Sequence, residues 1–552
     1  MGGPLGAVFS RFNRMLDWVR DRYSQALELL VHWKYIVLAV FVALLAATAW
    51  LYNTVPSAFL PDEDQGYFIT IVRGPEGASL NYTSDVVKQI EDTYLEIPEV
   101  RATFAVGGFG FSGNTANSAI VFTTLIPWSE RTSPGQSAQD IIGRVQGSLF
   151  QITEAQAFAV NPPSIQGLGT FSGFQYRLQD RRGNLDVNQF VQVANQLIGA
   201  ANQDPNLQAV FTTYAASNPQ IELQVDRNRA KALDVDINEV FNTLQTYLGS
   251  QYVNDFNLGR RTYRVYVQAD EPFRSSPEDI NQLYVRSNQG EMIPLSNLLQ
   301  TRDQTGAQSI THYNGYRSIE INGSAAPGTS SGVALEAMER VSDQVLPPGV
   351  GYQWSGTSLE EIESGGQAPI IFGLGLVFVF LVLAAQYESY VDPTVIMFAV
   401  PLAILGALLA QMIRGLPNDV YCQIGLVMLI GLSSKNSILI VEFANQLRCE
   451  GYSIVRAALE ASRQRLRPIL MTAISTLSSI FPLVIASGAG AASRHSLGTA
   501  VFGGMFVATL LSLFVVPILY VVIKSLSTRV LPRGEDAAPM GDEKTEKEKA
   551  VV

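Results

Sequence analysis

A single lysine lies within an otherwise apolar stretch of the 552-residue chain, and its charge gives that stretch a chemical meaning. Lys435 lies between Ile424 and Val441, with a long apolar run before it and a shorter one after it. A cation inside a bilayer costs roughly 2.5–3.5 kcal/mol even on the mildest insertion scale, so it needs an acidic partner or a water-lined path. Lys435 therefore indicates a route for ions or protons; the alternative is a lysine that only forms a salt bridge between two helices.

Four phenylalanines indicate an apolar binding pocket. Phe109 and Phe111 lie in a glycine-rich loop, 106–117, where side chains are usually polar, and Phe104 and Phe122 lie on the flanking strands that we predict. The glycines give the loop backbone freedom, and aromatic rings around such a loop can line an adaptable pocket. The alternative is that Phe104 and Phe122 are ordinary core residues.

No pattern indicates an enzyme site. The histidines His32, His312 and His495 are scattered, and phosphate loops, zinc spacings and nucleophile elbows are missing from the sequence. We therefore expect no metal and no cofactor, and any work must draw on an ion gradient rather than nucleotide hydrolysis. The acidic cluster 61–64 is predicted to be a solvated cap outside the first span.

The elements that position these residues begin with membrane helices. Hydrophobic residues make up 47% of the chain and charged residues 16%, which suits a membrane protein with a large water-exposed part. Six stretches are long and apolar enough to span a bilayer: Tyr35–Tyr52, Ile370–Ala385, Thr394–Met412, Ile424–Phe443, Pro468–Ser487 and Leu497–Ile523.

Basic residues near the span ends predict the orientation of the chain. They gather before the first span, between the fourth and fifth, and after the last, whereas the opposite side offers only Arg414 and Arg494. We therefore expect both termini to be cytoplasmic. The net charge of −11 argues against a nucleic-acid partner.

The residues before the first span have apolar side chains at helical spacing, among them Phe12, Tyr23 and Leu27. This pattern predicts an amphipathic helix on the inner membrane face; an ordinary packing helix is the alternative. Cys422 and Cys449 fall near opposite ends of one predicted span, too far apart to pair. The tail after Ile523 is predicted to be disordered.

Between the first and second spans the apolar periodicity changes repeatedly between two and 3.6 residues, which indicates ferredoxin-like subdomains of alternating strands and helices. A β-rich section with a protruding hairpin is predicted at about 220–299. The predicted fold is an α-helical membrane bundle of six spans, one plus five, with a large α+β region. Its parts are 1–34, an amphipathic helix; 35–52, the first span; 53–366, the α+β region; 367–523, five spans; and 524–552, the tail.

Several ordered motifs resemble those of resistance–nodulation–division (RND) multidrug efflux pumps of the hydrophobe/amphiphile branch, which is AcrB/MexB-like. The resemblance covers the whole chain up to Arg533 and matches the C-terminal half of a full-length pump. The motifs that carry it are Phe59–Gly66, Tyr252–Phe256, Arg414–Tyr421, Gly431–Phe443 and Arg465–Thr472.

The resemblance implies a proton-driven exporter of lipophilic and amphiphilic drugs in the inner membrane of a Gram-negative-type bacterium. It implies a trimer whose periplasmic porter and docking subdomains pass substrates to an adaptor and an outer-membrane channel. It assigns Lys435, Arg465 and Thr472 to a proton relay, and the four phenylalanines to a deep drug pocket. The switch loop beside that pocket contains Gly107, Gly108, Gly110 and Gly113.

Two features qualify the resemblance. The outer region contains only Met292 and Met338, too few thioethers for the soft-metal path of a copper or silver exporter. The paired aspartates of the relay belong to the other half of the family's pumps, and Glu442, the one carboxylate within the predicted spans, lies about 10 Å along the helix from Lys435. The chain is thus expected to be a half-transporter that needs an N-terminal half, a homo-oligomer that supplies both halves, or a non-transporting remnant or scaffold.

Overall fold

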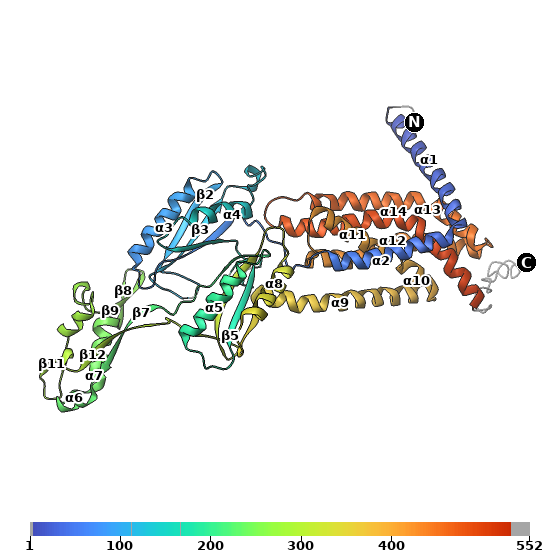
Figure 1. Cartoon of the computed structure of the whole chain (residues 1–552). Helices are drawn as coiled ribbons and strands as arrows, with labels where there is room; N and C mark the ends of the chain where they lie inside the picture. The colour runs from blue at the N-terminus through green and yellow to red at the C-terminus, as the bar shows by residue number, and fades with distance from the viewer. Residues whose placement is uncertain (1–3, 112, 166, 170, 531–552) are drawn as a thin grey trace, which may run out of the picture.

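The computed structural model describes residues 4–111, 113–165, 167–169 and 171–530, with side chains from Asn13 to Ser527. Figure 1 shows an elongated molecule in which three parts follow one another. A bundle of long helices forms one end, two α/β units lie in the middle, and the section between β7 and β12 forms the other end. The predicted tail falls mostly outside the described residues.

Among the described residues, six helical segments are long and apolar enough to cross a membrane, and one precedes the strands while five follow them. Five of them contain a predicted apolar run and continue beyond it, because a helix need not stop where the apolar residues end. The exception is α13, which ends at Val484, before the end of the predicted run Pro468–Ser487. The segments are α2 Lys34–Thr54, α9 Gly356–Tyr387, Val391–Arg414, α12 Val420–Cys449, α13 Ile454–Val484 and α14 Ala491–Val530.

The third predicted span, Thr394–Met412, is not one continuous helix. It comprises α10 Val391–Met397 and α11 Val400–Arg414, separated at residues 398 and 399. Pro401 lies in the first turn of α11, a position where its missing N–H leaves no helical hydrogen bond unmade. The sequence-based prediction missed this break.

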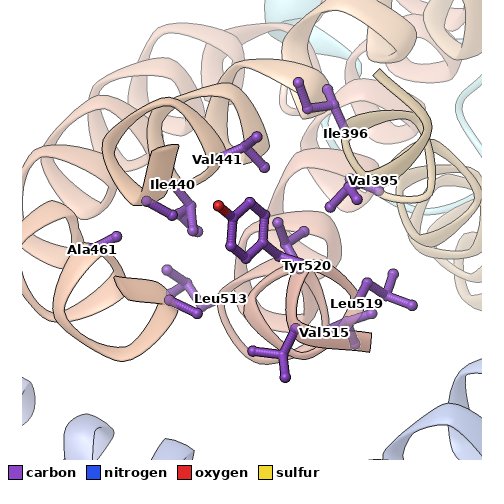
Figure 2. Close-up of a cluster of buried hydrophobic side chains, with 14 of the residues drawn as sticks. Val395, Ile396, Ile440, Val441, Ala461, Leu513, Val515, Leu519 and Tyr520 are labelled. Carbon is purple, nitrogen blue, oxygen red and sulfur yellow. The ribbon is translucent and has the colours of Figure 1, made fainter. Parts of the chain in front are cut away.

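α14 is the central helix of the bundle and packs against α11, α12 and α13. Figure 2 shows Tyr520 of α14 among Ile440 and Val441 of α12 and Val395 of α10, and all four side chains are buried. Closer to the sheets, the backbones of α11 and α14 nearly touch, since a Cβ atom on Gly406 would lie 2.6 Å from the carbonyl oxygen of Gly503. Such small residues allow membrane helices to approach closely.

The first α/β unit has the element order strand, helix, two strands, helix, strand. Its antiparallel sheet has the strand order β2-β3-β1-β4, which is that of the ferredoxin-like motif. Ser79 and Ser137 cap the two helices, whose apolar faces cover one face of the sheet. The elements are β1 Tyr67–Arg73, α3 Leu80–Leu95, β2 Val100–Gly107, β3 Ser118–Leu125, α4 Ala138–Leu149 and β4 Gln156–Val160.

The second unit repeats this topology with an insertion between its second and third strands. The sheet order is β13-β14-β5-β15, and β6 also pairs with β14. Tyr176 and Leu178 of β5 are fully buried beneath the two helices. The elements are β5 Phe174–Asp180, α5 Val187–Ala201, β6 Leu207–Phe211, β13 Thr311–Tyr313, β14 Tyr316–Ala325, α8 Ser331–Val345 and β15 Val350–Ser355.

The insertion runs from β7 to β12, whose strands pair along eight residues each, so it is wider than the predicted 220–299. Besides its strands it contains two α-helices, which begin after the capping residues Asp226 and Asp236. The expected hairpin is present as β8 and β9, and every residue of β8 is exposed. The elements are β7 Asn218–Val225, α6 Arg227–Ala232, α7 Ile237–Leu244, β8 Gln251–Leu258, β9 Arg261–Val267, β10 Tyr284–Arg286, β11 Met292–Pro294 and β12 Leu299–Gly306.

The first helix, α1 Pro4–His32, leaves the end of the bundle that lies far from the sheets (Figure 1). Its C-terminal half packs on the bundle: Leu27 is buried, and the Tyr23 hydroxyl donates a hydrogen bond to the Leu513 carbonyl at 2.6 Å. This half of α1 is therefore an ordinary packing helix, which was the alternative to an amphipathic helix on the membrane face. The two cysteines are unpaired, Cys422 being buried and Cys449 exposed.

Candidate functional site

Lys435 lies in the middle of α12, and its position follows from the packing of its neighbours. Ser434 and Asn436 are buried, and Asn436 donates a hydrogen bond to the Thr509 hydroxyl of α14 at 3.2 Å. This packing leaves Lys435 on an exposed face of α12. Within the part of the chain that the structure describes, Lys435 makes neither an ion pair nor a hydrogen bond, so it does not join α12 to another described helix by a salt bridge.

Arg465 and Thr472 lie on α13, two turns apart and both half-buried. The guanidinium carbon of Arg465 lies 4.4 Å from the centroid of the Phe443 ring on α12. Arg465 Nε is buried and has no hydrogen-bond partner among the described residues. The Thr472 hydroxyl donates to the Ile469 carbonyl at 3.0 Å, which keeps its oxygen available as an acceptor.

The three residues share one region of the bundle. α12 and α13 are consecutive, packed helices that run in opposite directions, and Phe443 marks the level of Arg465. Going from Phe443 to Lys435 along α12, and from Arg465 to Thr472 along α13, covers about 12 Å and about 10 Å in the same direction. Lys435 and Thr472 therefore lie at nearly the same depth, with Arg465 closer to the α1 end.

The long helices carry more carboxylates than the predicted spans did. Besides Glu442, they include Asp392 on α10 and Glu361 on α9, because these helices begin before the apolar runs. Asp392 pairs with Lys524 at 3.0 Å, and Glu361 accepts a hydrogen bond from Ser331 at 2.8 Å. Glu442 is exposed and accepts from Gln446. None of these carboxylates pairs with Lys435.

The predicted pocket residues form two pairs rather than one cluster. Phe104 and Phe122 face each other across β2 and β3, with ring centroids 6.2 Å apart, and Phe104 is 65% exposed. Phe109 and Phe111 meet in the loop with centroids 6.4 Å apart. Among the described residues no ring contact joins the two pairs. Because Phe104 is so exposed, it is not the core residue that the alternative reading required.

Phe111 belongs to a chain of rings that joins the two α/β units. Its ring meets that of Phe171 edge-on at 5.0 Å, Phe171 lies 6.2 Å from Phe211, and Phe211 stacks on Phe158 at 4.5 Å. Phe158 pairs with Ile71 across the sheet, so it lies on the face away from α3 and α4. Phe122 lies on that same face, since it pairs with Ile69, two residues from Ile71 on β1.

Sequence reasoning missed Phe158, Phe171 and Phe211. A signal for Phe171 was present, because it lies between Gly169 and Gly173 much as Phe109 and Phe111 lie among glycines. Phe158 was missed together with its strand β4, whose core-facing residues are alanines and give a weak strand pattern. Phe211 is the last residue of β6, and its pattern matches that of a core residue.

The glycine-rich loop that was predicted to be a switch loop is joined at its base by a backbone hydrogen bond. Gly108 and Gly113 have φ values of +75° and +136°, which only glycine adopts readily, and the Gly108 N–H donates to the Ser118 carbonyl at 2.8 Å. A cavity of about 60 Å³ lies beside Gly110 and Phe111, well below the several hundred Å³ of a drug site. Ser112, within the same loop, lies outside the described residues.

A larger apolar groove of about 740 Å³ lies among the membrane helices. It is lined by α2, α9, α11 and α12, with Tyr52, Asn53 and Gln423 among its polar residues and Phe372 and Ile424 among its apolar ones. Only 6% of the apolar window of α9 is buried. Figure 1 shows α9 at the side of the bundle.

The acidic cluster 61–64 is not the solvated cap that was predicted. Glu63 is buried and accepts hydrogen bonds from the start of α14. Asp64 pairs with the buried Arg131 at 2.7 Å. Burial alone would raise the pKa of Asp64, but hydrogen bonds from Arg131, Ala138 and Gly66 together hold it below its ordinary value. The partners lie far away in the sequence, so the local pattern could not reveal them.

A bundle of long apolar helices with a lysine in one of them, joined to two α/β units with aromatic rings between them, fits a protein of the membrane-transporter class. The model of the AcrB/AcrD/AcrF family matches residues 3–524. The chain therefore belongs to this family of RND multidrug efflux proteins, as its motifs predicted. Its six apolar helices and its family make it an inner-membrane protein.

Curated relatives are similar over nearly the whole chain. Multidrug resistance protein MdtF of Escherichia coli (strain K12) is 43% identical over 534 residues, which are 96% of this chain and 51% of the relative. The toluene efflux pump membrane transporter TtgB of Pseudomonas putida and the multidrug export protein AcrF of Escherichia coli (strain K12) are each 42% identical over 523 residues, 94% of this chain and 50% of each relative. The chain spans about half the length of the curated relatives it matches.

Proposed function

We propose that this chain is the C-terminal half of a proton-driven RND transporter that exports lipophilic and amphiphilic compounds. The observation that carries the proposal is the arrangement of Lys435, Arg465 and Thr472. These are two cations and a hydroxyl on the facing helices α12 and α13, within a family whose relatives are named as multidrug and solvent pumps.

The acids of this relay come from polypeptide outside the described chain. Lys435 lies on an exposed face of its helix without an ion pair among the described residues, and Arg465 presents a buried Nε that has no acceptor there. A buried cationic donor without an acceptor is costly. Carboxylates brought to this region would accept hydrogen bonds from both Lys435 and Arg465 and so remove this cost. An N-terminal half that carries paired aspartates supplies this chemistry.

The remaining parts take the roles that the family resemblance assigns. The two α/β units act as periplasmic porter subdomains, and the β7–β12 insertion acts as the docking subdomain toward an adaptor and an outer-membrane channel in a trimer. α1 and the end of α14 lie at the same end of the bundle, opposite the sheets (Figure 1), which supports cytoplasmic termini. The basic residues near the span ends support the same orientation.

Substrates bind where Phe109 and Phe111 now fill the space between the two α/β units. The cavity beside Phe111 is too small for a drug, so the switch loop must move away from Phe171 to admit one. The Phe104–Phe122 pair, on the same face of the sheet, extends the apolar wall. The groove beside α9 offers lipophilic compounds a place within the membrane.

Co-expression tests the proposal. The chain and the first half of a relative such as MdtF are produced together in a pump-deficient strain, and dye efflux is measured. We expect efflux only from the pair, its loss in Lys435→Ala, and full efflux in the control Lys88→Ala, which removes an exposed lysine of α3. Unchanged efflux in Lys435→Ala would refute the relay. Efflux from the chain alone would refute the need for a second half.

A further inference from the structure

Glu63 joins the segment that enters the first α/β unit to the start of the central membrane helix. Its carboxylate accepts hydrogen bonds from the backbone N–H of Ala492 at 3.2 Å, from the N–H of Ser493 at 2.8 Å, and from the Ser493 hydroxyl. These N–H groups belong to the first turn of α14, where a helix has no partners of its own. The side chain is buried, with Glu63 only 7% exposed, so the contact is shielded from water.

Asp64, the next residue, makes the corresponding contact with the α/β unit. Its carboxylate accepts from Arg131 at 2.7 and 3.0 Å and from the N–H of Ala138, the first residue of α4, at 3.0 Å. The Trp128 indole N–H also donates to it at 3.1 Å. Two adjacent carboxylates thus hold the N-termini of two helices, one in the bundle and one in the unit.

The connection between α14 and α4 through Glu63 and Asp64 is short and allows little relative movement. Two residues span at most about 7 Å of backbone, and a hydrogen bond of 2.8 Å loses most of its strength when it lengthens by 1 Å. α14 also packs against α12 and α13, the helices that carry Lys435, Arg465 and Thr472. A shift of α14 along its axis must therefore move the 61–66 segment and α4 with it, or break these bonds.

We propose that Glu63 and Asp64 form the coupling element through which movement of α14 is transmitted to the first α/β unit. Glu63 is a positioning residue in this element, since it acts through α14 and touches no substrate. This proposal rests on the proposed function, because the coupling element matters for transport only if it connects the relay helices to the drug-binding face. Asp62 lies outside the element: it is exposed, and it accepts a hydrogen bond from Ser172 at 2.5 Å.

A double-mutant cycle tests transmission without any need for transport. The full chain is placed in lipid nanodiscs, and hydrogen exchange is measured at residues 137–141 of the α4 start. Gly503→Ala perturbs α14, because its new Cβ would lie 2.8 Å from the Gly406 carbonyl oxygen. This position lies ten residues along α14 from Ser493, which contacts Glu63. We expect this change to speed exchange at 137–141 at least threefold, and to have no such effect when Glu63→Ala is also present.

Controls separate coupling from a local helix cap. Glu63→Ala alone should speed exchange about tenfold at 491–494, Glu63→Gln less so because it keeps an acceptor oxygen, and Asp62→Asn not at all. Gly425→Ala, whose Cβ would lie 3.1 Å from that of Ala500, is a milder perturbation of α14 if Gly503→Ala fails to fold. An equal response at 137–141 with and without Glu63, to whichever perturbation folds, would overturn the proposal.

The hydrogen-exchange cycle and the efflux assay test the two proposals separately. If Lys435→Ala leaves efflux intact, the relay is wrong, but the cycle still reports whether Glu63 joins α14 to α4. If the relay holds and the cycle shows no dependence on Glu63, the coupling element alone is refuted. In the co-expressed pump, we expect Glu63→Ala to reduce drug efflux at least fivefold while proton uptake continues.

Discussion

The guanidinium of Arg465 lies over the ring of Phe443, with 4.4 Å between its central carbon and the ring centroid. A cation over an aromatic face gains about 0.5–2 kcal/mol, depending on how well water is excluded. The contact joins α12 to α13 and fixes the orientation of a charged group that has a buried, unpartnered nitrogen.

Phe443→Leu should therefore weaken proton-coupled efflux several-fold in the co-expressed pump, since it removes the ring face but keeps an apolar side chain of similar size. Phe443→Tyr keeps the ring face and should retain most of the activity. Dye efflux from energised vesicles measures both variants. Equal efflux from the leucine and tyrosine variants would show that the ring does not position Arg465.

Replacing both loop phenylalanines, Phe109→Ala with Phe111→Ala, should lower resistance to large apolar drugs more than to small ones. The double change removes the edge contact with Phe171 and much of the apolar surface of the site. Phe150→Ala is the matched control, because Phe150 is 72% exposed at the end of α4 and remote from the loop. Inhibitory drug concentrations in the co-expressing strain are the measurement. Unaltered resistance to every drug would exclude the loop from the binding site.

The Asp64–Arg131 pair predicts a dependence of stability on pH. Burial favours the protonated carboxyl, but the hydrogen bonds from Arg131, Ala138 and Gly66 outweigh it, so the pKa of Asp64 in the folded chain lies below its ordinary value of 3.8. The folded state then binds this proton less readily than the unfolded state does. The contribution of Asp64 is fully present above the unfolded pKa and is lost as the pH falls below about 4 and through the folded pKa.

Thermal unfolding followed by tryptophan fluorescence and circular dichroism at pH 7, 5, 4 and 3 should detect this loss. Asp64→Asn should destabilise the first α/β unit by roughly 3 kcal/mol at pH 7, since it leaves the buried Arg131 without its carboxylate, and should flatten the acid dependence. Asp62→Asn, a neighbouring carboxylate change, should leave both the stability and its pH dependence close to those of the wild type. A steep acid dependence that persists in Asp64→Asn would assign it to another group.

Gly503→Ala should destabilise the helix bundle. Its new methyl group would meet Ala410 and the Gly406 carbonyl oxygen of α11, and overpacking of this kind costs about 1–3 kcal/mol. Gly431→Ala on α12 is the control, because open space surrounds the position of its new methyl group. Thermal stability in detergent should fall for Gly503→Ala and stay level or rise for Gly431→Ala. The same loss in both variants would show that the close contact between α11 and α14 does not decide the result.

The sequence predicted where the long helices lie better than where they end. Apolar length alone places a span, but the first turns of α9 lie outside any apolar run and are stabilised by contacts of Ser358 with β5. The break before α11 lies within an apolar run, and Pro401 after it was no clear signal, because Pro468 and Pro482 lie inside the continuous helix α13. The ferredoxin-like units were predictable from alternating periods, whereas β4 was not, because its alanines give little contrast between its two faces.

Residues that act with distant partners were the least predictable. Glu63 and Asp64 formed an acidic cluster in the sequence, and only the fold brings Ser493 and Arg131 to them. Phe158 and Phe211 come from different units and meet only because the two sheets face each other. Lys435 was predictable by contrast, since a charge within an apolar run is visible without any partner.

The chain leaves the second unit for the insertion after β6 and returns to it at β13, and both of these strands pair with β14 in one sheet. The first and last strands of the insertion, β7 and β12, pair along their full length. Its two points of attachment are thus held close together on both sides of the junction. A segment mounted in this way can be exchanged for that of a relative, by recombination or by design, without opening the unit that carries it. The surface of the insertion can therefore diverge while the phenylalanines between the two α/β units are left as they are.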